Sequence, residues 1–373
     1  MLFTKLIYLC TIFFKFQFSS SVSISYKQHK SRISFINTPN RSFLFNRHLK
    51  THNNVTLSGI QPSGELHIGN YIGCIQPCLT YQSNNNDLHM MIADNHALSG
   101  YNFGDNLREN TRKTIALTLA CGIDPNKTTI FAQSHFPQIL EMNWILGSFI
   151  KTSKFYKLAQ FRNRGVDSAD MSIAKFLYPL LMASDILALN ARLVIAGPDQ
   201  KINLSLARYS ARKLNRIIGS DTFIVPEPVY SHTYRVKSLS DGRKKMSKTG
   251  SSNMDVINLL DSEDMIYRKI RSAKTQSSDD DASPELNNLL ALYSIFSGRP
   301  YDDVVDHCDM SNFLKLKTDL ASHIIDFLSP IKRRFYDIYH DEHFIGSILE
   351  RSRHKLNNAF DNRLREVKQL FNC

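Results

Sequence analysis

The chain has 373 residues, 42% of them hydrophobic and 21% charged, which excludes an intrinsically disordered protein and allows one large domain or two ordinary ones. The formal net charge of +12 is unevenly spread, because eight of the 46 Lys and Arg residues fall within residues 1–50, which contain no acid. The remaining 323 residues hold 38 basic residues against 34 acidic ones, a balance that permits nucleic-acid binding without requiring it.

Residues 1–50 are predicted to be a targeting leader. The first acidic residue of the chain is Glu65, and the preceding segment is rich in Phe, Ser, Asn, Lys and Arg. Residues 6–14 form an apolar run that is too short to span a bilayer but long enough for a signal peptide, whereas residues 19–50 have the composition of a transit peptide. This two-part pattern favours a plastid reached through the secretory route (apicoplast-like), with a mitochondrial presequence as the alternative, and the mature form is expected to have no membrane association.

From residue 54 the hydrophobic pattern predicts alternating strands and helices. Strands are predicted at residues 55–57, 89–93, 129–132, 192–196 and 222–225. Helices are predicted at residues 107–121, 137–157 and 171–189. This alternation indicates an α/β fold, a Rossmann-like doubly wound parallel sheet over residues 54–252, with a helical insertion at about 137–190.

Beyond a boundary predicted near residues 250–256, almost the whole pattern is helical, and residues 255–373 are expected to form a C-terminal all-helical domain. Helices are predicted at residues 286–296, 311–328 and 344–370. Basic residues on these helices could face a nucleic acid, although each one is also explained by a solvated helix face. They are Lys332, Arg333, Arg334, Arg351, Arg353 and Lys355.

Two segments carry residues suited to phosphate chemistry. After the first strand, Gly64 and Gly69 allow a nucleotide to approach the backbone, and His67 and Asn70 offer neutral donors on one face of an opening helix turn. Nearly 180 residues later, residues 244–249 (Lys-Lys-Met-Ser-Lys-Thr) concentrate ammonium and hydroxyl donors that suit a departing pyrophosphate. Each segment alone is also explained by an ordinary loop, but the two in this order indicate an adenylate-forming site.

These segments resemble the HIGH and KMSKS signatures of class I aminoacyl-tRNA synthetases. Residues 62–70 are similar to the first signature and residues 245–249 to the second, with Thr249 in the final position. Residues 59–64 and 69–73 resemble the tryptophanyl branch in its bacterial and organellar form. Agreement continues at residues 93–97, 122–125, 181–187 and 197–201, so that the resemblance covers about residues 55–340.

The resemblance implies roles for individual residues. The catalytic ones would be His67, Asn70, Lys245 and Lys248. ATP would be contacted by Gln61, Pro62, Ser63, Gly69, Asn70, Gly197, Pro198, Asp199, Val236, Lys245, Met246, Ser247, Lys248 and Thr249. Two positions depart from the family pattern: Gly250-Ser251 follows the lysine signature where Asp-Pro is usual, and Pro198 stands where Glu is frequent. The details of ribose binding and loop closure depend on these positions.

A pocket for the amino acid is predicted around residues 178–185. Tyr178, Met182 and Asp185 fall at i, i+4 and i+7 on one helix face, and Pro179 is expected to begin that helix. A carboxylate in an apolar cleft pairs with the indole N–H of tryptophan, which only donates, although a capping or salt-bridging Asp is the alternative. Gln200 and His96 complete the predicted tryptophan-binding set, with His96 either structural or in contact with the backbone groups of the amino acid. Trp144 is expected to pack within a helix core.

The resemblance implies a tryptophan–tRNA ligase that uses ATP with Mg²⁺ as a substrate complex, acts on L-tryptophan and tRNA(Trp), and forms a homodimer. Residues 255–373 would be its anticodon-binding domain, with the basic residues of the C-terminal helices facing the tRNA. The six cysteines include no Cys-x-x-Cys pair and no histidine cluster at zinc spacing, so no metal ligand is proposed. Three alternatives are a tyrosyl-tRNA synthetase, a nucleotidylyltransferase, and a synthetase-derived tRNA-binding protein without activation. The nucleotidylyltransferase leaves the helical half unexplained.

Overall fold

The computed structural model describes residues 55–84, 87–100, 106–157, 172–230, 234–247, 252–275, 283–307 and 312–371. The predicted leader at residues 1–50 lies outside this set. In the described part of the chain, no helix combines the length and apolar character needed to cross a membrane.

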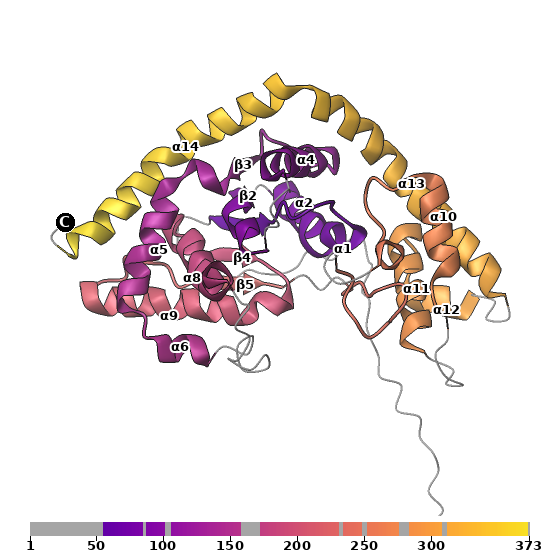
Figure 1. The fold of residues 1–373 in the computed structure, drawn as a ribbon, viewed down its shortest axis with the longest axis horizontal. Helices are drawn as coiled ribbons and strands as arrows, with labels where there is room; N and C mark the ends of the chain where they lie inside the picture. Colours follow the sequence, from indigo (N-terminus) through magenta and orange to yellow (C-terminus); the bar gives the residue numbers. More distant parts are fainter. Residues whose placement is uncertain are drawn as a thin grey trace, which may run out of the picture. The chain divides into compact units, whose positions relative to one another are not determined.

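Five parallel strands form a single sheet in the order β3-β2-β1-β4-β5 (Figure 1). They are β1 (Thr56–Ile60), β2 (Leu88–Ile92), β3 (Thr128–Ala132), β4 (Leu193–Ile195) and β5 (Glu227–Val229). In the central register, Ser58 lies opposite Met90 on one side and Ile195 on the other. The predicted parallel α/β sheet is confirmed. Because the strand order changes direction beside β1, the switch point of the fold lies between β1 and β4.

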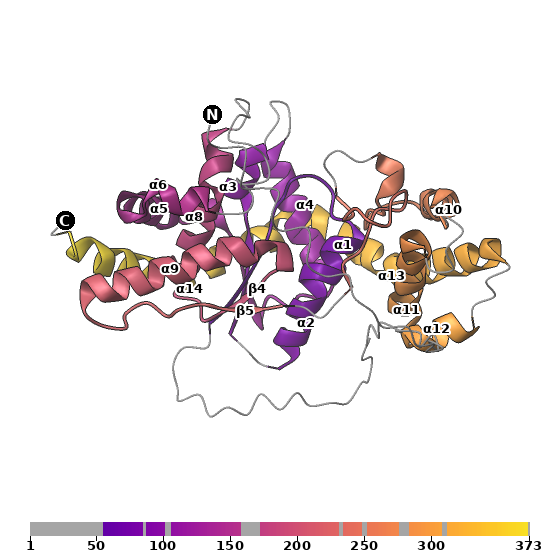
Figure 2. The same cartoon turned by 90° about the horizontal axis from the view of Figure 1, so that it is seen from below.

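Helices cover both faces of this sheet, as Figures 1 and 2 show from two directions. On one side lie α5 (Pro137–Phe149), α8 (Ile173–Ala188) and α9 (Lys201–Ile218), and on the other lie α2 (Gln76–Ser83) and α4 (Leu107–Ala120). Successive strand residues enter different cores: Met90 and Ile130 belong to one apolar cluster, Met91 and Phe131 to the other. This alternation follows from the two-residue period of a strand.

Short elements connect these layers. They are α1 (Ile68–Asn70), the π-helical turn η1 (Tyr71–Ile75), α3 (Asp94–Ala97), η2 (Leu98–Gly100), η3 (Gln133–His135), α6 (Thr152–Tyr156), η4 (Pro198–Gln200) and η5 (Asn253–Asp255). Several of them follow directly on the carboxyl end of a strand, where they place polar side chains beside one another.

The described residues after 262 are predominantly helical, which confirms the helices predicted there. They form α10 (Glu263–Ser272), α11 (Pro284–Ser297), α12 (Tyr301–His307), α13 (Phe313–His340) and α14 (Glu342–Gln369). Helix α13 packs against α4 and α10, while α14 packs against β3 and α5. Leu320 of α13 joins the core that contains Met90, and Phe360 of α14 joins the core that contains Met91.

The strand predicted at residues 222–225 is wrong, because the fifth strand is β5. The side chain of Asn215 accepts a hydrogen bond from Phe223 N (2.8 Å) and donates one to Phe223 O (2.8 Å). Asn190, which has a positive φ of 52°, accepts from Ile224 N through its side-chain oxygen (2.9 Å). Side chains therefore occupy the backbone groups that a strand would use for pairing.

Two further expectations about helices are wrong. Pro179 does not begin its helix but lies inside α8, whose N-cap Ser172 accepts from Lys175 N (3.2 Å). Trp144 does not pack in a core, since it is 83% exposed on α5. The buried positions of α5 are Ile139, Met142 and Leu146, which leave Trp144 on the outer face of the helix.

Candidate active site

The predicted site residues gather where the parallel strands end. Of the predicted residues, Gln61 follows β1, His96 follows β2, and Asp199 follows β4 after a three-residue gap. Asp94 and Gln133, which the sequence did not single out, follow β2 and β3. In a parallel sheet these carboxyl ends meet at one edge, and the switch point between β1 and β4 is the expected place for a nucleotide. Topology therefore brings together residues that are up to about 140 positions apart in the chain.

The turn after β1 has a tightly fixed geometry. Gly64 has a φ of +99°, and a Cβ at Gly69 would lie 2.9 Å from the His67 ring, so both positions need glycine. His67 is the N-cap of α1, with its Nδ1 accepting from Gly69 N (3.1 Å), and its own N–H donates to Asn70 Oδ1 (3.0 Å). Since Nδ1 accepts, the neutral imidazole carries its proton on Nε2. The Asn70 amide likewise keeps its NH₂ group for donation.

A segment beyond the second signature supports this turn. Ile68 N donates to Ile257 O (3.0 Å), Leu259 N donates to Leu66 O (2.8 Å), and His67 is paired with Asn258 in an antiparallel bridge. The His67 side chain is 4% exposed. The turn after β1 is therefore fixed by backbone bonds from residues almost 190 positions later.

The second signature is carried by what we call the lysine hairpin, residues 236–247. Its two arms are joined by bonds from Met246 N to Val236 O (3.0 Å) and from Ser238 N to Lys244 O (2.9 Å). Val236 and Met246 are buried in the core, so their predicted ATP contacts would have to involve backbone atoms. Ser247 is half-buried, while Lys248 and Thr249 lie outside the described residues.

Lys245 joins the lysine hairpin to the switch point. Its Nζ lies 3.3 Å from Asp199 Oδ2, and both side chains are partly exposed. Although partial burial works to raise the pKa of the Asp199 carboxyl, Lys245 and a hydrogen bond from Gln200 hold that pKa below its ordinary value. At Gly197 a Cβ would lie 2.4 Å from Asp199 Oδ1, so glycine is needed for this carboxylate position. Neutral pH therefore leaves an ion pair at the predicted nucleotide site.

The residues predicted to contact ATP differ in exposure. Ser63, Pro198, Asp199 and Lys245 are exposed, whereas Pro62 is buried. Gln61, Gly69, Asn70, Gly197 and Ser247 are half-buried. The exposed members lie on loops at the carboxyl edge of the sheet, where a ligand can reach them.

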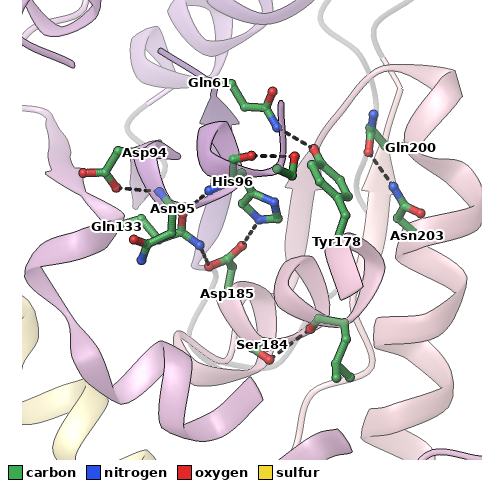
Figure 3. Close-up of polar contacts among 12 residues, drawn as sticks. Gln61, Asp94, Asn95, His96, Gln133, Tyr178, Ser184, Asp185, Gln200 and Asn203 are labelled. Atoms are coloured by element: carbon green, nitrogen blue, oxygen red, sulfur yellow. Dashed lines mark hydrogen bonds and ion pairs between the residues drawn. The ribbon is translucent and has the colours of Figure 1, made fainter. Parts of the chain in front are cut away.

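Asp185 is the centre of a buried polar cluster (Figure 3). Its side chain is 2% exposed, with Oδ2 2.8 Å from His96 Nε2 and Oδ1 accepting from Gln133 Nε2 (2.6 Å). Because a carboxylate only accepts, His96 Nε2 is the donor in this contact. Each carboxylate oxygen has further lone pairs, so these two bonds leave capacity for a ligand N–H.

Tyr178 lies on the same face of α8 as Asp185, seven residues before it. Its hydroxyl accepts from Gln61 Nε2 (3.1 Å), and its ring centroid is 4.4 Å from that of His96. Burial, followed by the carboxylates of Asp185 and Asp199, raises the pKa of Tyr178 to about 12, so the phenol is neutral near pH 7.

The other two residues of the predicted tryptophan-binding set are Met182 and Gln200. Met182 is half-buried against the core that includes α8. Gln200 bonds to neighbours on its own segment, accepting from Asn203 Nδ2 (2.9 Å) and donating to Asp199 Oδ2 (3.1 Å). In Figure 3 Gln200 and Asn203 form a pair separate from the Asp185 cluster.

The sequence did not single out Gln133, Asp94 or Asn95 as site residues. Gln133 donates to Asp185 and also accepts from His96 N (3.3 Å), while Asp94 accepts from Ser134 through both N–H and hydroxyl. Each follows a predicted strand at the same sheet edge as the recognised residues, and that position was the available signal. Among the residues that the structure describes, His96 Nδ1 and Asn95 Nδ2 are buried without a hydrogen-bond partner, which marks the places where a ligand could bond.

Three of the basic residues predicted to face tRNA donate side-chain hydrogen bonds within the chain. Lys332 Nζ donates to Asp261 O (2.5 Å), Arg351 to Asn126 Oδ1 (3.2 Å), and Lys355 to Thr129 Oγ1 (2.8 Å). Of the other three, Arg353 lies 3.7 Å from Glu350, and Arg333 and Arg334 are exposed on α13.

No group of three or more His, Cys, Asp or Glu side chains with the geometry of a metal site occurs within the described ranges.

The chain was compared with known proteins. The family model described as tRNA synthetases class I (W and Y) matches residues 49–329, which is more than half of the chain. A tryptophan--tRNA ligase of Caldanaerobacter subterraneus subsp. tengcongensis is 36% identical over 318 residues, which cover 84% of this chain and 96% of that protein. A chloroplastic/mitochondrial tryptophan--tRNA ligase of Arabidopsis thaliana is 38% identical over 314 residues, covering 79% and 76% respectively.

A solved structure shows that the similarity extends to the fold. A crystal structure of tryptophanyl-tRNA synthetase from Campylobacter jejuni, complexed with ADP and tryptophan, matches with a TM-score of 0.70 at 25% sequence identity. The match covers 86% of this chain and 100% of that one. The similarity therefore extends over the sheet and the C-terminal helices together.

Proposed function

Because the chain belongs to the class I tRNA synthetases of the tryptophan and tyrosine family, we propose that it is a tryptophan–tRNA ligase. In the first step, the carboxylate of L-tryptophan attacks the α-phosphate of ATP and gives tryptophanyl-adenylate with release of pyrophosphate. In the second step, the 2′-OH of the terminal adenosine of tRNA(Trp) attacks the acyl carbon and releases AMP. The names of the relatives and the tryptophan in the Campylobacter complex support this activity.

The observation that carries the proposal is the buried carboxylate of Asp185. Its two donors, His96 and Gln133, fix its orientation, and its remaining lone pairs accept the indole N–H of tryptophan. Phenylalanine offers no such donor, so binding it would leave the carboxylate short of a partner. A site of this kind rejects the analogue without the donor by roughly 10⁴-fold, and no separate editing step is needed.

His96 gains a specific role in this proposal. With its Nε2–H bonded to Asp185, the ring would present Nδ1 as an acceptor, and no partner for this buried atom occurs among the residues that the structure describes. An acceptor suits the α-ammonium of the bound amino acid better than its carboxylate. The residue would therefore orient the substrate as well as holding Asp185.

ATP is proposed to bind at the switch point between β1 and β4. His67 and Asn70 would donate to charge that develops on the α-phosphate, and Lys245 would exchange its contact with Asp199 for the leaving pyrophosphate. For Lys248 and Thr249, the resemblance alone implies contact with the leaving pyrophosphate. No covalent nucleophile is required, since in-line positioning and electrostatic stabilisation supply the rate. Mg²⁺ would enter with the ATP phosphates as part of the substrate.

The remaining assignments concern partners and location. Arg333 and Arg334, exposed on α13, are the cations that we assign to the tRNA(Trp) surface. A homodimer is proposed, supported by exposed Trp144 and Leu140 on α5, and sedimentation velocity of the mature chain tests it. The leader supports an organellar location, a plastid rather than a mitochondrion. A fluorescent reporter fused to residues 1–50 distinguishes the two.

Amino-acid-dependent pyrophosphate exchange tests the function directly. We expect exchange with Trp, and we expect Asp185→Ala to lower kcat/KM for Trp by roughly 10⁴-fold, because the indole N–H loses its acceptor. Ser184→Ala is the matched control, since Ser184 is equally buried on the same helix but bonds back to Leu180 O (3.0 Å). This variant should retain Trp activation.

Three results would contradict the proposal. Activation of Tyr and not Trp would assign the chain to the other branch of the family. Binding of tRNA without any exchange would identify a synthetase-derived binding protein. Wild-type rates in a folded Asp185→Ala variant would show that the pocket has been assigned to the wrong residues.

A further inference from the structure

Helix α11 touches the lysine hairpin through a buried side chain. Asn288 of α11 is 1% exposed, and its Oδ1 accepts from Lys237 N (3.0 Å) while its Nδ2 donates to Lys237 O (3.2 Å). A carboxamide offers the same donor and acceptor pair as a peptide group. Asn288 therefore bonds to the outer arm of the hairpin as a neighbouring strand would.

The same helix also contacts the hairpin at its tip. Glu285 Oε1 accepts from Gly242 N (3.2 Å). A Cβ at Gly242 would lie 2.3 Å from Pro284 C and 2.5 Å from Glu285 N, so this glycine lets the tip approach the first turn of α11. Two points of the hairpin are thus held by one helix of the C-terminal half.

A short series of contacts connects Asn288 with the predicted nucleotide site. Lys237 is paired with Lys245 across the hairpin in an antiparallel bridge, and Lys245 Nζ lies 3.3 Å from Asp199 Oδ2 beside β4. The position of the Lys245 ammonium therefore depends on where the opposite arm is held. On that arm, the backbone N–H and the carbonyl of Lys237 both bond to the side chain of Asn288.

We propose that Asn288 is a positioning residue for adenylate formation, acting through Lys237 to set the place of Lys245 at the ATP phosphates. This inference rests on the proposed function and deepens it. Asn288 touches no substrate in this arrangement. Its loss affects the step that needs the Lys245 ammonium, and it leaves the tryptophan pocket around Asp185 unchanged.

The test measures Trp-dependent pyrophosphate exchange in Asn288→Leu and Asn288→Asp. Asn288→Leu removes both bonds to Lys237, whereas Asn288→Asp keeps an acceptor for Lys237 N but replaces the donor to Lys237 O. We expect kcat/KM for ATP to fall by roughly 10- to 100-fold in the Leu variant, because small misplacements of a catalytic group have effects of that size. The Asp variant should show an intermediate loss. Direct Trp binding should stay within about twofold of wild type.

Ser294→Ala is the matched control. Ser294 is 5% exposed on the same helix, and its hydroxyl bonds to Arg299 O (2.6 Å), away from the hairpin. A general effect of destabilising α11 would appear in this variant as well. Gly242→Ala disturbs the second contact between the hairpin and α11, at Pro284 and Glu285, and should reproduce the loss specific to ATP. The inference therefore stays testable if Asn288→Leu does not fold.

The outcomes separate this inference from the function on which it rests. If wild type shows no Trp-dependent exchange, the proposed function fails. If wild type exchanges and the folded Asn288 and Gly242 variants match Ser294→Ala, the positioning role is overturned. Equal losses for ATP and Trp would also overturn it, since they indicate general destabilisation.

Discussion

At the scale of single residues, the carboxylate of Asp185 depends on neutral donors that follow other strands. Gln133 donates to its Oδ1 at 2.6 Å, and Gln133 Oε1 also accepts from the backbone N–H of His96. One carboxamide thus connects the ends of β2 and β3 with α8. A hydrogen bond to a charged group contributes about 1.5–3 kcal/mol, and under the proposed function this makes Gln133 a determinant of tryptophan affinity.

We predict that Gln133→Leu raises KM for Trp about tenfold or more, because the Asp185 carboxylate loses a donor that holds it toward the indole N–H. KM for ATP should stay near the wild-type value, since the switch-point residues are untouched. Pyrophosphate exchange at varied Trp and varied ATP measures both constants. A Trp KM within twofold of wild type in the folded variant would count against this role.

The sequence predicted part of this site and missed the rest for a physical reason. Tyr178, Met182 and Asp185 share one helix, so a spacing of four and three residues is enough to place them together. Gln133 meets Asp185 across 52 positions of sequence, and periodicity carries no information about such a contact. Its position directly after a strand was the only local sign.

At the scale of elements, the segment between α9 and β5 is ordered by side chains in place of strand pairing. Asn215 near the end of α9 bonds to both backbone groups of Phe223, whose side chain is 1% exposed. A short run of apolar, β-prone residues, Phe223 to Val225, predicts a strand at this place. The prediction fails because two asparagine side chains satisfy the backbone groups first, and local propensity does not show such competition.

We predict that Asn215→Ala lowers the free energy of unfolding by about 1–3 kcal/mol, because the Phe223 N–H and carbonyl lose their partners in a partly buried place. Exchange kinetics should remain unchanged, since this loop carries none of the assigned site residues. Urea unfolding followed by circular dichroism gives the stability. The prediction fails if stability is unaltered or if KM for either substrate shifts in parallel.

At the scale of the whole described chain, α14 completes a core that begins in the sheet. The ring of Phe360 lies 4.6 Å from that of Phe136 and 6.2 Å from that of Phe131, measured between centroids. The sequence predicted a helix over residues 344–370 from its periodicity, and that is confirmed. It did not reveal which surface this helix covers, since an apolar helix face is compatible with many partners.

We predict that Phe360→Ala lowers the free energy of unfolding by about 3–5 kcal/mol, as expected for the loss of a buried phenyl ring. Hydrogen exchange should accelerate in β3 and α5 as well as in α14, because all three share the cavity. Phe344→Ala, at a position 37% exposed on the same helix, is the control and should have a small effect. Acceleration confined to α14 would show that its packing does not support the sheet.

The place of Phe360 also affects the order of events during synthesis. Phe131 and Phe136 are made more than two hundred positions before the ring that covers them. At roughly 5–20 residues per second, the sheet half therefore spends on the order of ten seconds or longer on the ribosome with one core incomplete. A polypeptide that closes its core late remains easier to unfold in that interval, which is compatible with passage through a translocation pore.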